Sequence, residues 1–190
     1  MKGYSVAGIE IPDTNMAKAA CELIRGMHSA LLFNHSNRVF LFAVIIGEHR
    51  RLLFDAELLY AAALFHCIGL THHYHRSQKR FEVDSADAAR EFLKGYGCPK
   101  DDIGQVWDAI ALHTTPNIAE HKSPLVALLA AGVEMALFGR HSDALKATDM
   151  TLIMGAYPKQ QGFRHELLNI LDNALAQRPR DALGTLSDDV

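Results

Sequence analysis

The sequence has few cysteines and no long run of basic residues. Its three cysteines, Cys21, Cys67 and Cys98, form no CxxC pair. Scattered cysteines in an odd number favour free thiols in a reducing compartment over a disulfide framework. Basic residues occur only in short pairs such as Arg50-Arg51, and the net charge is -3. The chain therefore lacks the charge pattern of a nucleic-acid-binding protein or of a polybasic lipid-binding surface.

The sequence also lacks a recognisable signal peptide. Its N-terminal segment contains a proline and acidic residues where a signal peptide requires an apolar core. The longest apolar stretches, 39–47 and 58–65, are shorter than the ~20 residues that a membrane-spanning helix needs. We therefore expect a cytoplasmic protein that binds a small molecule and neither nucleic acid nor membrane. The apolar excess of several segments is compatible with a homodimer.

Helical periodicity dominates the sequence, and no segment shows the alternation of a strand. The predicted helices cover residues 15–26, 34–47, 56–69, 86–95, 103–113, 125–138, a short segment from 149, and 163–176. The polar segment 71–83 is expected to be a surface loop. We predict an all-α fold of roughly seven to nine helices. It forms a single domain, 1–190, with an N-terminal extension (1–27) and a C-terminal tail (178–190).

Local residues suggest where several of these helices begin and end. Asp13 or Thr14, Asp55, and Asp84 or Ser85 have side chains suited to capping a helix N-terminus. Pro124 suits the first turn of a helix, and Gly139 suits the position just after its end.

Three of the eleven histidines adjoin apolar helical runs, namely His35, His66 and His113. A buried imidazole needs a partner, and several converging from different helices could form a metal site. Alternatively, each ring interacts favourably with a helix terminus and has no further role. The cluster His72-His73-Tyr74-His75 lies in the polar loop, either as solvated residues or as part of a lid.

Four strings in order carry a specific resemblance: NHSNRVFLFA, ELLYAAALFHCIGL, RFEVDSADAAREFL and VWDAIALHTTP. Together they resemble the HD-domain superfamily of metal-dependent phosphohydrolase-like proteins, and most closely its cyanamide hydratase-like branch. The resemblance covers residues 28–190. It implies an antiparallel helical bundle with a divalent metal in its interior, zinc foremost, or iron or manganese.

The resemblance also implies roles for particular residues. The metal ligands would be His35, the doublet His66-Cys67 and, as the late carboxylate, Glu134. His113 and Asn34 would act on the substrate. Supporting contacts to ligands or substrate would come from Glu82, Asp84 and Thr114, although both acids could instead cap the helix that follows them. The implied activity is hydrolysis or hydration of a small nitrogenous, nitrile- or cyanamide-like molecule.

The doublet departs from the family pattern, because Cys67 stands where the family has aspartate. A thiolate offers one soft donor atom, which favours zinc or ferrous iron. If Cys67 is instead a small buried apolar residue, no metal is bound. The chain would then be a degenerate, non-catalytic HD-like domain that binds a small ligand or a partner. Iron-dependent oxygen chemistry in the same cavity is a third hypothesis.

Overall fold

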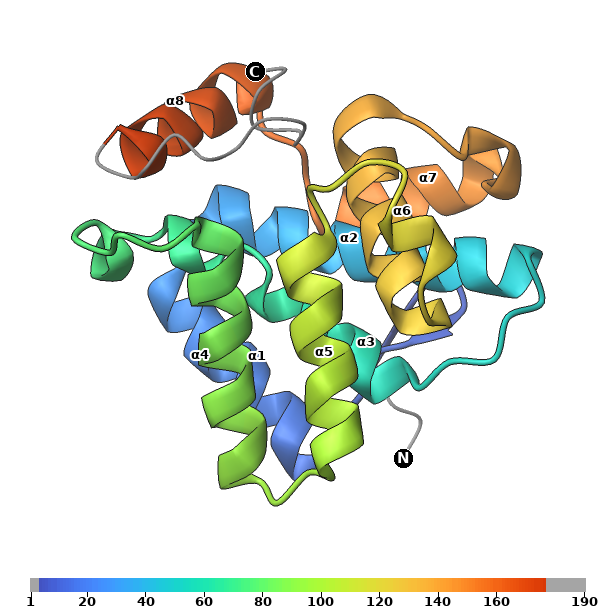
Figure 1. Ribbon diagram of the computed structural model, residues 1–190. Coiled ribbons are helices and arrows are strands. Elements are labelled where there is room, and N and C mark those ends of the chain that lie inside the picture. The colour runs from blue at the N-terminus through green and yellow to red at the C-terminus, as the bar shows by residue number, and fades with distance from the viewer. Residues whose placement is uncertain (1–3, 177–190) are drawn as a thin grey trace.

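The computed structural model describes residues 4–176, and helices make up most of this part (Figure 1). The α-helices are α1 (Asn15–Met27), α2 (Ala30–His49), α3 (Ala56–Phe65), α4 (Phe81–Gly95), α5 (Lys100–Leu112), α6 (Pro124–Phe138), α7 (Ala147–Ala156) and α8 (Phe163–Leu175). Short 3-10 turns lie at Ile68–Leu70, His72–Tyr74, Ala119–His121 and Ser142–Ala144. The all-α prediction is confirmed, and the eight helices fall within the predicted range.

A two-stranded hairpin near the N-terminus was not predicted. Strands β1 (Ser5–Val6) and β2 (Ile9–Glu10) pair antiparallel, with Val6 opposite Ile9. Ala7 and Gly8 between them both have positive φ, 52° and 81°, as a tight hairpin turn requires. The expectation of no strand was therefore wrong, because two-residue strands are too short to show an alternating pattern.

Helix α2 is the central helix of the bundle. It is buried almost all round and packs closely against α6, where a Cβ on Gly132 would meet the carbonyl oxygen of Val39. By length and composition alone α2 could cross a membrane, but 83% of its most apolar window is buried inside the protein. It is longer than predicted, because Ser29 caps it and accepts a hydrogen bond from the backbone N–H of Leu32.

Most of the predicted helix ends are confirmed, and one is wrong. Thr14 and Asp55 accept hydrogen bonds from the first turns of α1 and α3. Pro124 opens α6, and Gly139 follows it with a φ of 69°. The prediction for α4 was wrong, because this helix begins at Phe81 and already includes residues 84 and 85.

Helix α8 lies across one end of the bundle (Figure 1). Its residues Phe163 and Leu167 are buried in an apolar cluster with Leu32, Cys67 and Phe81, from three other parts of the chain. At the opposite terminus, α1 packs on α2 and α3 and contributes to the main core. The predicted tail, 178–190, lies outside the described residues.

Candidate metal centre

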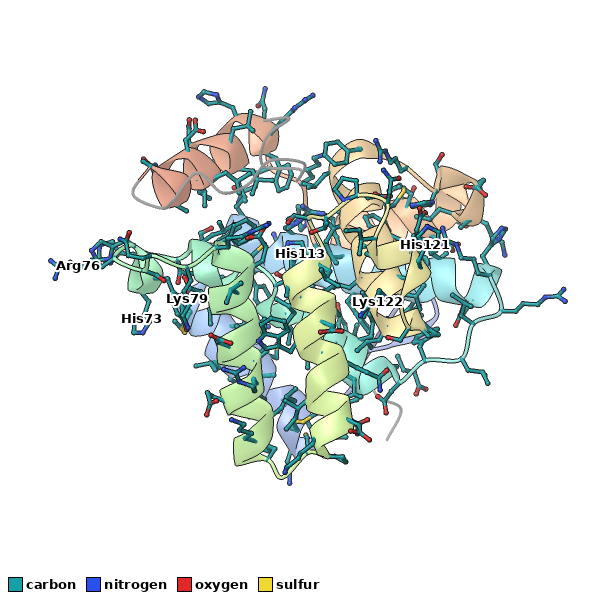
Figure 2. The ribbon with its side chains drawn as sticks, viewed as in Figure 1. His73, Arg76, Lys79, His113, His121 and Lys122 are labelled. Carbon is teal, nitrogen blue, oxygen red and sulfur yellow. The ribbon has the colours of Figure 1, made fainter. Side chains whose placement is uncertain are left out.

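Three histidines from different helices converge beneath α8. His35 lies in the second turn of α2, His66 directly follows α3, and His113 directly follows α5, at whose end Figure 2 shows it. The ring centroids of His35 and His66 are 5.3 Å apart, and those of His66 and His113 are 5.1 Å apart. All three side chains are buried, at most 4% exposed. The fold thus brings together the three histidines singled out from the sequence.

Cys67 completes a compact group of donor atoms. One ligand atom each from His35, His66 and Cys67 lie within 4.8 Å of one another. The Sγ atom of Cys67 is 3.1 Å from Nε2 of His66. Two imidazole nitrogens and a sulfur at this separation form a donor set that fits zinc or ferrous iron.

Backbone carbonyl groups fix the orientation of two of the rings. Nδ1 of His66 lies 2.7 Å from the carbonyl oxygen of Ala63, and Nδ1 of His113 lies 2.6 Å from that of Ile110. Because a carbonyl oxygen only accepts, both Nδ1 atoms carry the proton and both Nε2 atoms keep a lone pair. Nδ1 of His35 has no hydrogen-bond partner among residues 4–176. The bonds to backbone thus orient Nε2 of His66 and of His113 as the atoms that could bind a metal.

Burial keeps these imidazoles neutral. It lowers the pKa of His35 to about 3, with a further contribution from the neighbouring guanidinium of Arg38. Burial also holds the pKa of His66 well below its ordinary value, helped by His113 and His35, and lowers that of His113. Only neutral imidazole binds a metal, so the site is ready for one at neutral pH.

The Cys67 thiol is protonated when nothing is bound. Burial, and then the negative charge of Glu82, raise its pKa far above the usual value. A thiolate at this position therefore requires a positive charge beside it, such as a metal ion.

Glu82 supports His113 from the side of α4. Its buried carboxylate accepts a hydrogen bond from Arg80 Nη2 at 2.7 Å and another from Thr114 Oγ1. Burial opposes the charged carboxylate, but Arg80, His113 and Thr114 together lower the pKa of Glu82 below its usual value. Glu82 and Thr114 thus form a charged, hydrogen-bonded support directly beside His113.

The donor atoms face a small and largely apolar cavity of about 60 Å³. The apolar residues in its wall are Leu70, Phe81, Val133, Leu137, Phe138, Leu167 and Leu171. Leu167 and Leu171 come from α8, which covers the histidines from above. The cavity has room for a few heavy atoms and little to offer a large polar molecule.

A comparison with family models matches residues 32–154 to the HD domain, which is more than half of the chain. The chain belongs to the HD-domain family. HD domains form a superfamily of metal-dependent phosphohydrolase-like proteins, in which a divalent metal is typical. The matched range contains the three histidines and Cys67, whereas α8 follows it. A comparison with curated proteins found no match.

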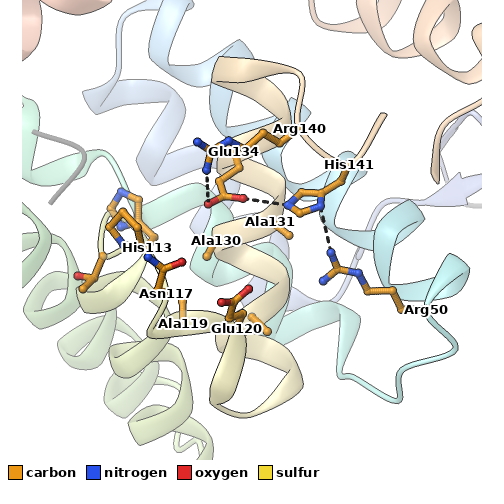
Figure 3. Close-up of a pocket in the computed structure, with 13 residues that line it drawn as sticks. Arg50, His113, Asn117, Ala119, Glu120, Ala130, Ala131, Glu134, Arg140 and His141 are labelled. Atoms are coloured by element: carbon orange, nitrogen blue, oxygen red, sulfur yellow. Dashed lines mark hydrogen bonds and ion pairs between the residues drawn. The ribbon is translucent and has the colours of Figure 1, made fainter. Parts of the chain in front are cut away.

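Glu134, expected as the late carboxylate ligand, lies apart from the donor atoms of His35, His66 and Cys67. Its carboxylate lies 2.9 Å from Nε2 of His141 and 3.4 Å from Nη1 of Arg140, in the wall of a separate cavity of about 250 Å³ (Figure 3). His113 lines both cavities and stands between them. The sequence identified Glu134 as the acid of α6 but did not show where its side chain points. In the structure the side chain lies on the other side of His113 from the donor atoms.

Asn34 and Asp84 also lie apart from the donor atoms. Asn34 Nδ2 donates to the carbonyl oxygen of Pro158 at 3.3 Å and lines a different pocket, with His28 and Arg25. Asp84 accepts a hydrogen bond from Ser77 Oγ at 2.9 Å, which ties the preceding loop to α4. Neither side chain lines the cavity of the histidines.

Two polar residues near the centre were missed. His28 is 8% exposed, and neither of its ring nitrogens has a hydrogen-bond partner in the described part of the chain. Arg38 is 1% exposed and lies one helical turn after His35. Arg38 directly precedes the long apolar run of this helix, which was a visible sign of a buried role. Nothing comparable marked His28.

Proposed function

We propose that this HD-domain protein binds one divalent metal, preferably zinc, and adds water to a small nitrogenous molecule such as a nitrile or cyanamide. The observation that carries the proposal is the group of donor atoms of His35, His66 and Cys67 within 4.8 Å. They lie in a small cavity with largely apolar walls. A metal held here would supply a water molecule of lowered pKa, and so a hydroxide nucleophile near neutral pH.

The number and type of donors favour catalysis over a purely structural site. Three protein ligands leave a fourth tetrahedral position for water or substrate, whereas structural zinc sites use four protein ligands. Sulfur and imidazole nitrogen favour zinc or ferrous iron over manganese, which prefers oxygen. The carboxylate of Glu82 is engaged by Arg80 and Thr114.

His113 has the properties of a general acid–base group. Its Nδ1 proton is held by Ile110, so Nε2 can accept a proton from the attacking water and return it to the substrate nitrogen. Glu82 stabilises the imidazolium form, since its charge raises the pKa of His113 against the effect of burial. Hydration of a C≡N bond requires these two transfers: oxygen adds to carbon, and a proton adds to nitrogen.

The size of the cavity favours a small and compact substrate. About 60 Å³ of space between apolar walls admits a group of a few heavy atoms. A linear nitrile fits such a space, and the apolar walls exclude bulk water from the reacting carbon.

A second candidate is a degenerate domain that binds a ligand without catalysis. The observation in its favour is the contact of Cys67 Sγ with His66 Nε2, because the doublet then satisfies itself without a metal. In this case the cavity would hold a small apolar ligand and no metal.

Elemental analysis of the purified full-length protein tests the proposal. We expect about one zinc or iron per chain, lost in His35→Ala and in His66→Ala. Glu134→Gln serves as the matched control and should retain the metal, since Glu134 pairs with His141. A wild-type protein that holds no metal after reconstitution, yet binds small ligands, would establish the second candidate.

Activity is tested by following nitrile hydration with NMR. His113→Gln should keep the metal and lose most of the turnover, by about 10²–10⁴-fold, the range for loss of a general acid–base group. Unchanged turnover in this variant would remove His113 from the proposed mechanism.

A further inference from the structure

Arg38 is a buried cation with unused hydrogen-bond donors. Its Nη1 atom donates to the backbone carbonyl oxygens of Tyr157 and Pro158, each at 3.0 Å. Its Nε and Nη2 atoms have no hydrogen-bond partner among residues 4–176. No ion pair joins Arg38 to a carboxylate within this range, although the residue is only 1% exposed. A buried charge normally has a partner.

The two unused donors lie together on one edge of the guanidinium. Nε–H and one Nη2–H of an arginine point in parallel and match the two oxygens of a carboxylate or a phosphate. The bonds from Nη1 to residues 157 and 158 hold the plane of the group. Because these bonds leave the other edge free, Arg38 is already oriented for an anion.

Arg38 lies beside the metal centre, although it does not line the cavity of the histidines. Arg38 follows His35 by three residues on α2, so the two side chains share one face of the helix. The ring of Phe163 lies 5.7 Å from the His35 ring and 5.1 Å from Arg38 Cζ. Phe163 thus adjoins both the ligand histidine and the guanidinium.

A second cation lies at the rim of the same region. Lys159 Nζ is 5.0 Å from the centroid of the Phe163 ring. Arg38 Cζ lies 5.1 Å from the centroid of the same ring, so the two cations share one aromatic neighbour. Arg38 remains charged at neutral pH, because burial lowers its pKa only to about 10. Two cations next to a metal centre attract a negatively charged ligand.

We propose that Arg38 and Lys159 bind an oxyanion, a carboxylate or a phosphate, beside the metal centre. The site therefore selects small anionic molecules, for example a nitrile that carries a carboxylate. The selection of the reacting group rests on the function proposed above, whereas the anion subsite rests on Arg38 and Lys159 alone.

The test compares cyanoacetate with its neutral amide, cyanoacetamide, by calorimetry on the full-length protein. These molecules share the nitrile and nearly the same size, so they differ mainly in charge. We expect cyanoacetate to bind ~10-fold or more tightly, which corresponds to one charge-assisted hydrogen-bonded contact. Inorganic phosphate is the third probe, and tighter binding of phosphate would assign the subsite to a phosphorylated molecule.

Two variants locate the subsite. Arg38→Lys keeps the charge but removes the free edge, and Lys159→Met removes the exposed cation; each should weaken cyanoacetate binding by about 10-fold. Lys146→Met is the matched control, because it removes the charge of an exposed lysine directly before α7. The ¹⁵N resonance of the Arg38 Nε–H should also shift on addition of cyanoacetate, which reports binding without any turnover.

The two proposals fail independently. Equal binding of cyanoacetate and cyanoacetamide, or unchanged binding in both variants, would overturn the anion subsite even if neutral nitriles are hydrated. Selective anion binding that depends on Arg38 and Lys159, in a protein without hydration activity, would establish the subsite and remove the proposed function.

Discussion

His66 and Cys67 place their donor atoms on the same side of the cavity, with Nε2 of the imidazole 3.1 Å from Sγ of the thiol. Consecutive residues achieve this because α3 ends at Phe65 and the chain turns into the 3-10 segment Ile68–Leu70. Since Nδ1 of His66 already donates to Ala63, the thiol proton points to the Nε2 lone pair. A metal would displace that proton and bind both atoms. The doublet is thus a closed pair without metal, and it offers two donor atoms to one.

The chemical identity of residue 67 should set the metal preference. Cys67→Ser removes the soft donor with little change in size, and we expect zinc affinity to fall by at least ~10-fold. Cys67→Asp supplies oxygen donors and should shift preference from zinc toward manganese. Competition with a chromophoric chelator measures both affinities. Equal zinc affinity in wild type and Cys67→Ser would mean that the sulfur is not a ligand.

The cover provided by α8 should protect the Cys67 thiol. Burial and a raised pKa both slow alkylation, because the thiolate is the reactive form. In a timed reaction with iodoacetamide, followed by mass spectrometry, we expect Cys67 to react more slowly than the half-buried Cys21 and Cys98. Leu167→Ser should accelerate only Cys67. Equal rates for the three thiols would show that α8 does not close the cavity.

The turn after the doublet depends on a glycine. A Cβ on Gly69 would collide with the backbone carbonyl oxygen of Phe81 and crowd Ser85 Oγ, which accepts a hydrogen bond from the Gly69 N–H. We expect Gly69→Ala to lower the free energy of unfolding by roughly 1–3 kcal/mol. Gly104→Ala, in the exposed face of α5 with open space around it, should raise it by ~0.5–1 kcal/mol. Urea denaturation of both variants measures the contrast.

Acid should destabilise the fold through buried neutral histidine. Burial lowers the pKa of His28 from 6.5 to about 4, so between these values the unfolded chain binds a proton that the folded chain does not. The free energy of unfolding is therefore highest above pH 6.5, and His28 reduces it by up to about 1.4 kcal/mol per pH unit on acidification toward pH 4.

Urea denaturation between pH 7 and pH 4.5 measures this dependence. His28→Leu should make the profile less steep without abolishing its slope, because His35, His66 and His113 are also buried with lowered pKa values. His73→Gln, which removes an exposed imidazole, serves as the control. A profile that is the same in His28→Leu and wild type would contradict the assignment.

Much of the fold was predictable because helix periodicity and end residues act locally. The cap at Thr14, the cap at Asp55 and the close of α6 at Gly139 all follow from single residues and their neighbours. The start of α4 was not predictable in this way. Asp84 and Ser85 look like caps, but they bond instead to Ser77 and Gly69, contacts that exist only in the folded chain.

The candidate site, like the fold, was predictable in part. His35, His66 and His113 stood out because each adjoins an apolar run, and the resemblance to HD domains predicted their convergence. Glu134 was assigned by elimination as the acid of its helix. The direction of its side chain was not known from the sequence, and in the structure it points to Arg140 and His141. Side-chain direction on a helix that is apolar nearly all round cannot be read from periodicity.

The covering helix α8 has a consequence for relatives of this protein. The family match ends at residue 154, so the scaffold that holds the donor atoms and the segment that closes the cavity are separate parts of the chain. Lys159 and Phe163, which adjoin Arg38, also follow the matched range. The segment that closes the cavity can therefore vary without any change in the residues that carry the donor atoms.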